Sequence, residues 1–201
     1  LKINLIVMAT HGHTGLKRVL LGSTTERVVR HAPCPVLTVR SGTRAPGRQD
    51  LSLAPRINRI LVPVDFSVRS KEAVKFAAGL ARVMQARLTI LHIAEPLPLP
   101  LFAHHENELA FYEAEALTEV RGKLNALAKL VPTDVPVKTM CRSDAPARGI
   151  LHAARTSRSG LIVIPTRGLT GAKHFLLGST AEAVVRRASC PVLTIGQSPS
   201  Q

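Results

Sequence analysis

The chain has 201 residues, of which 45% are hydrophobic, and its 27 Lys and Arg against 13 Asp and Glu give a formal net charge of +14. This length suits one or two domains, and the composition is that of a globular protein rather than a disordered or collagen-like chain. With 3% aromatic residues, the core must be aliphatic, which argues against base-stacking platforms for single-stranded nucleic acid. No apolar run reaches the roughly 18 residues of a membrane helix and no secretion signal opens the chain, so we expect a cytoplasmic protein without a membrane span.

An internal repeat begins the chain and recurs near its end. A shift of 156 positions aligns Leu5–Val39 with Leu161–Ile195, and 23 of the 35 aligned pairs are identical. Each copy has the pattern of an aliphatic strand (Leu5–Met8 and Leu161–Ile164), a glycine-rich loop, a helix and a strand that starts Cys-Pro-Val-Leu-Thr. The first copy lacks the residues that precede the second. Because the chain starts at Leu1 rather than Met, we expect further residues upstream.

Strands and helices alternate between the two copies. The expected strands are Arg59–Val64, Leu88–Ala94 and a run near Val135–Met140. The expected helices are Lys71–Gln85 with Ser67 or Ser70 as cap, one within His104–Leu130, and one near Pro146–Thr156.

This alternation predicts an α/β fold. We expect a five-stranded, parallel-type open sheet with helices on both faces and right-handed crossovers. Residues 56–197 would form this complete domain, and residues 1–40 would be the carboxyl-terminal β-α-β part of a second copy. Residues 41–55, which are rich in Gly, Pro, Ser and Arg, read as a linker.

A candidate ligand site follows from this sheet, because such folds bind ligands beyond the carboxyl ends of their strands. Asp65 ends the first strand of the complete domain, where it can accept hydrogen bonds from a ribose or help to hold Mg²⁺. After the fourth strand, Gly168 and Gly178 let backbone N–H groups approach an anion, and Ser179 and Thr180 add hydroxyl groups at the start of a helix. Together they predict a nucleotide site. Each residue alone also fits a turn or a helix cap, and neither a Walker loop nor a dinucleotide fingerprint is present.

Several of these runs together resemble the universal stress protein family. They are residues 60–67 (ILVPVDFS), Leu91-His92-Ile93, Thr166-Arg167-Gly168 followed after nine residues by Gly178-Ser179, and the Cys-Pro-Val-Leu-Thr ending. The resemblance covers residues 56–195, and residues 1–40 as the tail of another copy, so it implies a tandem member with a truncated first domain. It also implies a Rossmann-like fold of the adenine nucleotide alpha-hydrolase type, stress-linked signalling and, in one subset, ATP binding.

The ATP-binding subset uses Gly-x-x-Gly, nine residues, then Gly-Ser/Thr. Carried over by this resemblance, Pro63 and Asp65 would lie at the adenosine and Ile93 and Ile164 would line the adenine pocket, while the phosphates would be held by Gly168, Gly178, Ser179 and Thr180. Pro165 stands in place of the first glycine and removes a backbone N–H. The first copy keeps Gly12, Gly22 and Ser23 but has no counterpart of Asp65, so it holds only a partial site.

Three functions stay open. The first is a stress-response module that binds ATP or a related adenine nucleotide, with or without Mg²⁺; with no assignable base or arginine finger, we expect at most slow hydrolysis. The second is an interaction module without nucleotide, in which Pro165 closes the pocket. The third is weak nucleic-acid binding through the basic residues 137–187, although we do not expect nucleic acid to be the main partner. We further expect a homodimer or pseudo-dimer through the last strand, Val192–Ile195, and no metal site.

Overall fold

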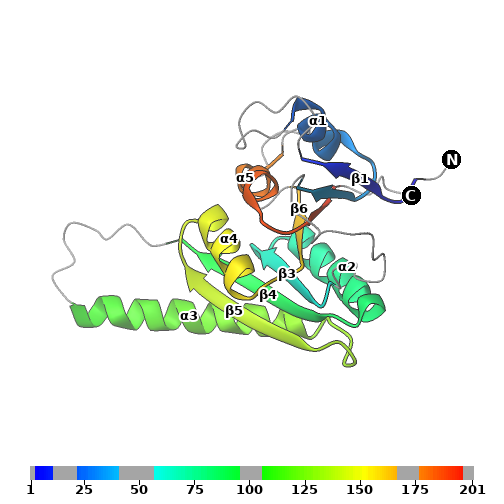
Figure 1. Cartoon of the computed structure of the whole chain (residues 1–201). Coiled ribbons are helices and arrows are strands. Elements are labelled where there is room, and N and C mark those ends of the chain that lie inside the picture. Colours follow the sequence, from blue (N-terminus) through cyan, green and yellow to red (C-terminus); the bar gives the residue numbers. More distant parts are fainter. Residues whose placement is uncertain (1–2, 11–21, 41–56, 96–105, 167–176, 197–201) are drawn as a thin grey trace.

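A computed structural model of the chain describes residues 3–10, 22–40, 57–95, 106–166 and 177–196, with the backbone alone over 106–114. The described strands form one seven-stranded sheet in the order β1-β2-β7-β6-β3-β4-β5 (Figure 1). These strands are β1 (Ile6–Ala9), β2 (Val36–Val39), β3 (Arg59–Val64), β4 (Arg87–Ala94), β5 (Val137–Ser143), β6 (Leu161–Pro165) and β7 (Val192–Ile195). The helices are α1 (Ser23–His31), α2 (Val68–Met84), α3 (Glu106–Ala128), α4 (Pro146–Thr156) and α5 (Ser179–Arg187).

The predicted α/β class, and the order of its strands and helices, are confirmed. The five strands β3 to β7 of residues 59–195 are joined by parallel pairings. Several boundaries differ from the expected ones by one to three residues. For example, α2 begins at Val68 rather than Lys71, because Ser67 is its N-cap and accepts a hydrogen bond from the Ser70 N–H. Ser70 is therefore not the cap, and its hydroxyl group bonds Asp65 instead.

Helices cover both faces of the sheet because alternate strand residues point to opposite sides. On one face, Ile60 and Val62 of β3 pack with buried alanine and leucine side chains of α2 and α3. On the other, Leu61 packs with α4 and α5, and α1 belongs to the same layer. The core is aliphatic, as the composition predicts. Burial of each such side chain contributes about 1.5–3 kcal/mol before entropy is counted.

The two copies of the repeat meet through their last strands. β2 and β7 pair antiparallel, with the register Val36↔Thr194, Leu37↔Leu193 and Thr38↔Val192. Because Val36 is the repeat equivalent of Val192, this register places a local two-fold axis between Leu37 and Leu193. Two buried hydroxyl groups repeat the symmetry: Thr38 Oγ1 donates to Val192 O at 3.0 Å, and Thr194 Oγ1 donates to Val36 O at 3.2 Å.

This pairing occupies the strand edge that we expected to join two copies. β7 has β6 on one side and β2 on the other, so the contact is made within one chain as a pseudo-dimer. A second chain cannot add to β7 in this arrangement, because both of its edges are already hydrogen-bonded.

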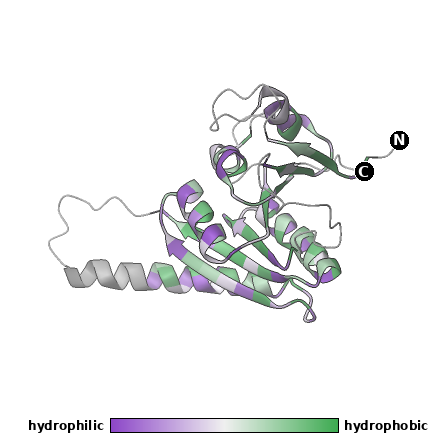
Figure 2. Cartoon of the chain, viewed as in Figure 1, coloured by the Kyte–Doolittle hydropathy of each residue, from purple (hydrophilic) through white to green (hydrophobic). Residues whose placement is uncertain are grey.

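Among the described elements, helices pack on one face of the first copy. Figure 2 shows β1 as an apolar strand at the end of the sheet. Val7 is 60% exposed, whereas Val163, its equivalent in β6, is fully buried. The difference arises because β6 pairs with β3 and is covered by α2, while β1 has β2 as its one neighbour among the described strands. Among the described helices, none is both long enough and apolar enough to cross a membrane.

Candidate functional site

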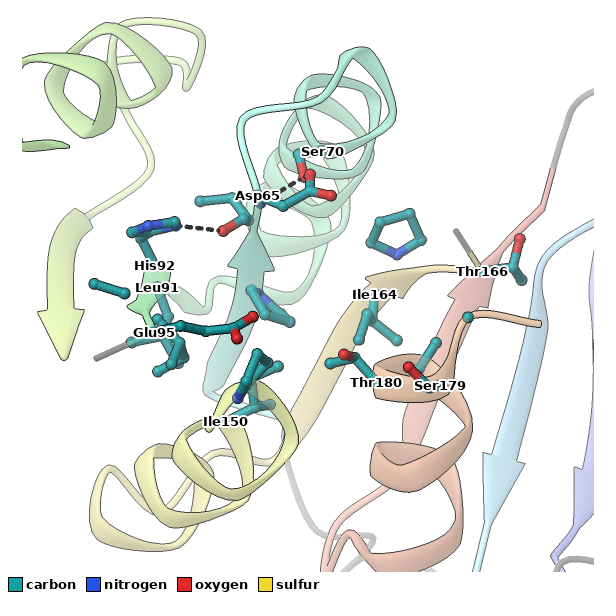
Figure 3. A pocket seen from close by; sticks show the side chains of 18 residues that line it. Asp65, Ser70, Leu91, His92, Glu95, Ile150, Ile164, Thr166, Ser179 and Thr180 are labelled. Atoms are coloured by element: carbon teal, nitrogen blue, oxygen red, sulfur yellow. Dashed lines mark hydrogen bonds between the residues drawn. The ribbon is translucent and has the colours of Figure 1, made fainter. Parts of the chain in front are cut away.

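A pocket of about 410 Å³ lies at the carboxyl ends of β3, β4 and β6 (Figure 3). The chain leaves β3 toward α2 on one face of the sheet and leaves β6 toward α5 on the other. The two strands are neighbours, so the divergence opens a crevice between them, which is where open α/β sheets bind ligands. The volume falls within the range of about 300–1,000 Å³ typical of small-molecule sites.

Asp65 is held at the β3 side of the pocket by hydrogen bonds from the start of α2. Its Oδ1 accepts from Ser70 Oγ at 2.5 Å and from the Ser67 N–H at 3.0 Å. The Asp65 N–H in turn donates to Ser70 Oγ at 3.0 Å. Ser70 is 1% exposed, so its hydroxyl group bonds both the backbone and the side chain of Asp65 in a buried setting. These bonds fix the orientation of the carboxylate toward the pocket (Figure 3).

A strained turn follows Asp65. Phe66 has φ of 65°, a left-handed conformation that costs a bulky residue on the order of 1–3 kcal/mol and persists only where its surroundings enforce it. Its ring lies 4.4 Å from the ring of His92, centroid to centroid, and Lys123 Nζ lies 5.7 Å from the Phe66 centroid. His92 Nδ1 makes a 2.9 Å hydrogen bond with Val64 O, which ties β4 to the end of β3. These contacts stabilise the turn that places Asp65 beside the pocket.

The opposite side of the pocket is the amino end of α5. Gly178 is the N-cap and contributes no side-chain hydrogen bond, while its N–H donates to Thr166 O at 2.8 Å. The first N–H groups of a helix lack intrahelical partners and carry partial positive charge, which favours an anion. Ser179 and Thr180 add hydroxyl groups here, and both line the pocket. The geometry therefore suits a negatively charged group.

Apolar side chains separate these two polar ends. Ile93 of β4, Ile164 of β6 and Ile150 of α4 line the pocket, and Pro165 forms part of its wall. Pro165 continues β6 opposite Ile195 of β7 and leaves the pocket open beside it. An apolar middle with polar ends suits a ligand that has a flat apolar ring, a hydroxylated part and an anionic part.

The structure brings most of the predicted site residues into this one pocket. Its lining includes Pro63, Asp65, Ile93, Ile164, Gly178, Ser179 and Thr180. Gly168 and Gly12 lie outside the described residues. Gly22 is the N-cap of α1 and Ser23 is its first residue. The Gly22 N–H donates to Thr10 O at 3.2 Å, as the Gly178 N–H does to Thr166 O in the second copy.

Four polar residues of the pocket were not among the predicted site residues. They are Ser70, His92, Glu95 and Thr166. Glu95 directly follows β4, which ends at the pocket, so its position in the sequence is enough to predict that it lies at the site. The sequence indicates Ser70 only as a possible helix cap, because its two bonds to Asp65 depend on how the turn after β3 folds back.

The described residues include no group of three or more His, Cys, Asp and Glu side chains that could hold a metal ion. Near the pocket, the side-chain hydrogen bond from Arg148 holds the pKa of Asp144 below its ordinary value.

Cys34, Cys141 and Cys190 are free thiols.

Cys190 should react slowly in the folded protein. Burial raises the pKa of its thiol to about 11, so on the order of 0.1% of it is thiolate at pH 8, and thiolate is the reactive form. We expect iodoacetamide at pH 8 to modify Cys190 far more slowly in buffer than in concentrated urea, as measured by mass spectrometry of the peptide that contains it. Equal rates in the two conditions would show that the thiol is not shielded.

The fold and the pocket at its switch point define an α/β protein of the Rossmann-like class. The family model of the universal stress protein family matches residues 1–40 and 56–196. The chain belongs to the universal stress protein family.

Individual relatives agree with this assignment. A universal stress protein of Methanocaldococcus jannaschii is 32% identical over 142 residues, which are 68% of this chain and 81% of that protein. One of Thermus aquaticus is 34% identical over 136 residues, with 68% and 96% covered. A longer one of Mycobacterium tuberculosis is 29% identical over 197 residues, 96% of this chain but 62% of the relative.

Solved structures share the fold. Universal stress protein UspA of Lactobacillus plantarum is 28% identical with a TM-score of 0.57, and the match covers 70% of this chain and 98% of that one. A putative universal stress protein of Pseudomonas aeruginosa has a TM-score of 0.68 at 20% identity and covers 97% of this chain and 64% of that one. A universal stress protein in complex with cAMP has a TM-score of 0.51 at 22% identity, with 70% and 98% covered.

Proposed function

We propose that this chain binds an adenine nucleotide, ATP or a related molecule, in the pocket at the ends of β3, β4 and β6, and acts as a stress-response signalling module. The observation that carries the proposal is the order in which chemical groups follow one another across the pocket. The Asp65 carboxylate lies at one end, and the apolar side chains of Ile93 and Ile164 lie in the middle. The amino end of α5, with Ser179 and Thr180, lies at the other end. This order matches the ribose, base and phosphate of a nucleotide. That a protein of the same fold is described in complex with cAMP supports the choice of an adenine ring.

Each residue has a defined part in this proposal. An ionised carboxylate accepts up to about four hydrogen bonds, so Asp65 can accept from ribose hydroxyl groups in addition to its bonds from α2. Ile93 and Ile164 contact the base, and the N–H groups of α5 face the phosphates. Mg²⁺ would be held mainly by phosphate oxygens and water, as is usual for this ion, with a carboxylate such as Asp65 in support.

We propose the domain assignment as well: a complete domain over residues 56–197, a linker over 41–55, and the closing part of a second domain over 1–40. The split match of the family model to residues 1–40 and 56–196 supports it. We place the protein in the cytoplasm, which three free thiols support because such thiols are typical of reducing compartments.

A calorimetric titration with ATP and Mg²⁺ tests the nucleotide proposal. We expect the unmodified chain to bind and Asp65→Asn to bind at least about tenfold more weakly, because hydrogen bonds to an ionised acceptor are roughly twice as strong as those to a neutral one. Asparagine keeps an oxygen for the Ser67 and Ser70 donors, so the turn should stay folded.

The matched control is Asp134→Asn. Asp134 is half exposed and pairs with Arg82, and it is not part of the pocket lining. This variant should bind ATP like the unmodified chain. If the unmodified chain binds none of ATP, AMP and cAMP, or if the two variants bind equally, the proposal is wrong.

A further inference from the structure

Gly149 lies in the first turns of α4, directly behind the apolar wall of the pocket. A Cβ atom built on this residue would lie 2.7 Å from Ile93 Cδ1, 3.2 Å from Ile93 Cγ1 and 3.1 Å from Asp144 Cβ. Real Cβ atoms do not approach other atoms to 2.7 Å, so any side chain here requires something to move. Gly149 is buried, yet it is not among the pocket-lining residues, whereas Ile93 is.

A glycine at this position costs helix stability. In a helix interior glycine is about 1 kcal/mol less favourable than alanine. At Gly79 of α2 and Gly122 of α3 an added Cβ would meet nothing within 4 Å, so space does not require glycine there. At Gly149 a side chain would need the volume that the δ-methyl group of Ile93 now occupies, so this methyl group would have to move.

The displaced atom borders the open volume of the pocket, because Ile93 is one of the lining residues. Ile93 is anchored by β4, which pairs with β3 on one side and β5 on the other, so its backbone is fixed. Its side chain lies between α4 and the pocket. If an atom were added on α4, the δ-methyl group would turn toward the empty volume of the pocket, where the proposed function places the base.

We propose that Gly149 is a positioning residue of the pocket: by leaving room beside α4 for the Ile93 δ-methyl group, it holds the apolar wall back and so determines the thickness of the ring that the pocket admits. The inference depends on the proposed function for the identity of that ring. The position of the wall itself does not depend on it.

The test uses three variants of the whole chain: Gly149→Ala, Gly149→Ala with Ile93→Val, and Gly79→Ala as the matched control. Gly149→Ala should change the ¹³C shift of the Ile93 δ-methyl group in the free protein, since that shift reports the side-chain rotamer. It should also weaken binding of ATP with Mg²⁺ at least about tenfold by calorimetry. Gly79→Ala should change neither.

The double variant separates positioning from damage to α4. Valine lacks the δ-methyl group that lies nearest to the added Cβ, so Ile93→Val should recover most of the ATP affinity lost in Gly149→Ala. An Ile93 methyl signal that is unchanged in Gly149→Ala would overturn the inference, and so would equal loss of affinity in the single and double variants. Should the unmodified chain bind no adenine nucleotide, the proposed function fails by itself, and the methyl signal still decides whether Gly149 positions the wall.

Discussion

Leu161→Ala should lower the free energy of unfolding by about 2–5 kcal/mol, whereas Leu5→Ala, the same change in the first copy, should lower it by less than about 0.5 kcal/mol. Both leucines begin the same Leu-Ile-Val run. Leu161 is 2% exposed beneath α2 and pairs with Ile60 of β3, so alanine would leave a cavity in a packed layer. Leu5 is 47% exposed and loses little on truncation.

Urea denaturation followed by circular dichroism measures both changes. The midpoint should fall for Leu161→Ala and stay near its original value for Leu5→Ala, with similar slopes. A comparable loss in the two variants would show that the first copy is covered in solution by something that makes Leu5 as buried as Leu161.

Ser70→Ala should lower the free energy of unfolding by about 1–3 kcal/mol and also weaken nucleotide binding. The Ser70 hydroxyl group donates to Asp65 Oδ1 and accepts from the Asp65 N–H, and it is buried, so alanine leaves both groups without this partner. Asp65 then loses the bond that aims its carboxylate into the pocket. Denaturation and calorimetric titration with ATP and Mg²⁺ measure the two effects.

Ser67→Ala is the comparison for this prediction. It removes the cap of α2 and should cost about 0.5–2 kcal/mol, but it leaves both bonds between Ser70 and Asp65 in place. We therefore expect Ser67→Ala to lose stability while it keeps more of its nucleotide affinity than Ser70→Ala. The reverse order of affinities would mean that the cap, rather than Ser70, orients Asp65.

The order of strands and helices was predictable because local patterns carry it. Hydrophobic periodicity identified α2, and short aliphatic runs identified β3 and β4. The candidate site was largely predictable too, since strand ends and a helix start in an α/β fold converge at one edge of the sheet. The family resemblance assigns a set of residues to the site, and all of them that lie within the described structure line one pocket.

The remaining features depend on contacts between segments far apart in the chain. Nothing near Ser70 in the sequence indicates that its hydroxyl group bonds Asp65 twice, because that depends on the left-handed turn at Phe66. The need for glycine at position 149 is equally hidden, since the atom that fills its space belongs to Ile93 on another element.

The repeat shows most clearly what the sequence determines alone. The residues that its two copies share are enough to specify the same strand, helix and strand twice, because secondary structure follows from local periodicity and capping. The sequence predicted pairing through the last strand but left open whether the partner is a second chain or the first copy. Only the tertiary structure decided that the two last strands pair within one chain around Leu37 and Leu193, and that Val7 is exposed where Val163 is buried. Burial is set by neighbouring elements: β6 lies beside β3 and under α2, whereas no described strand or helix takes those places at β1.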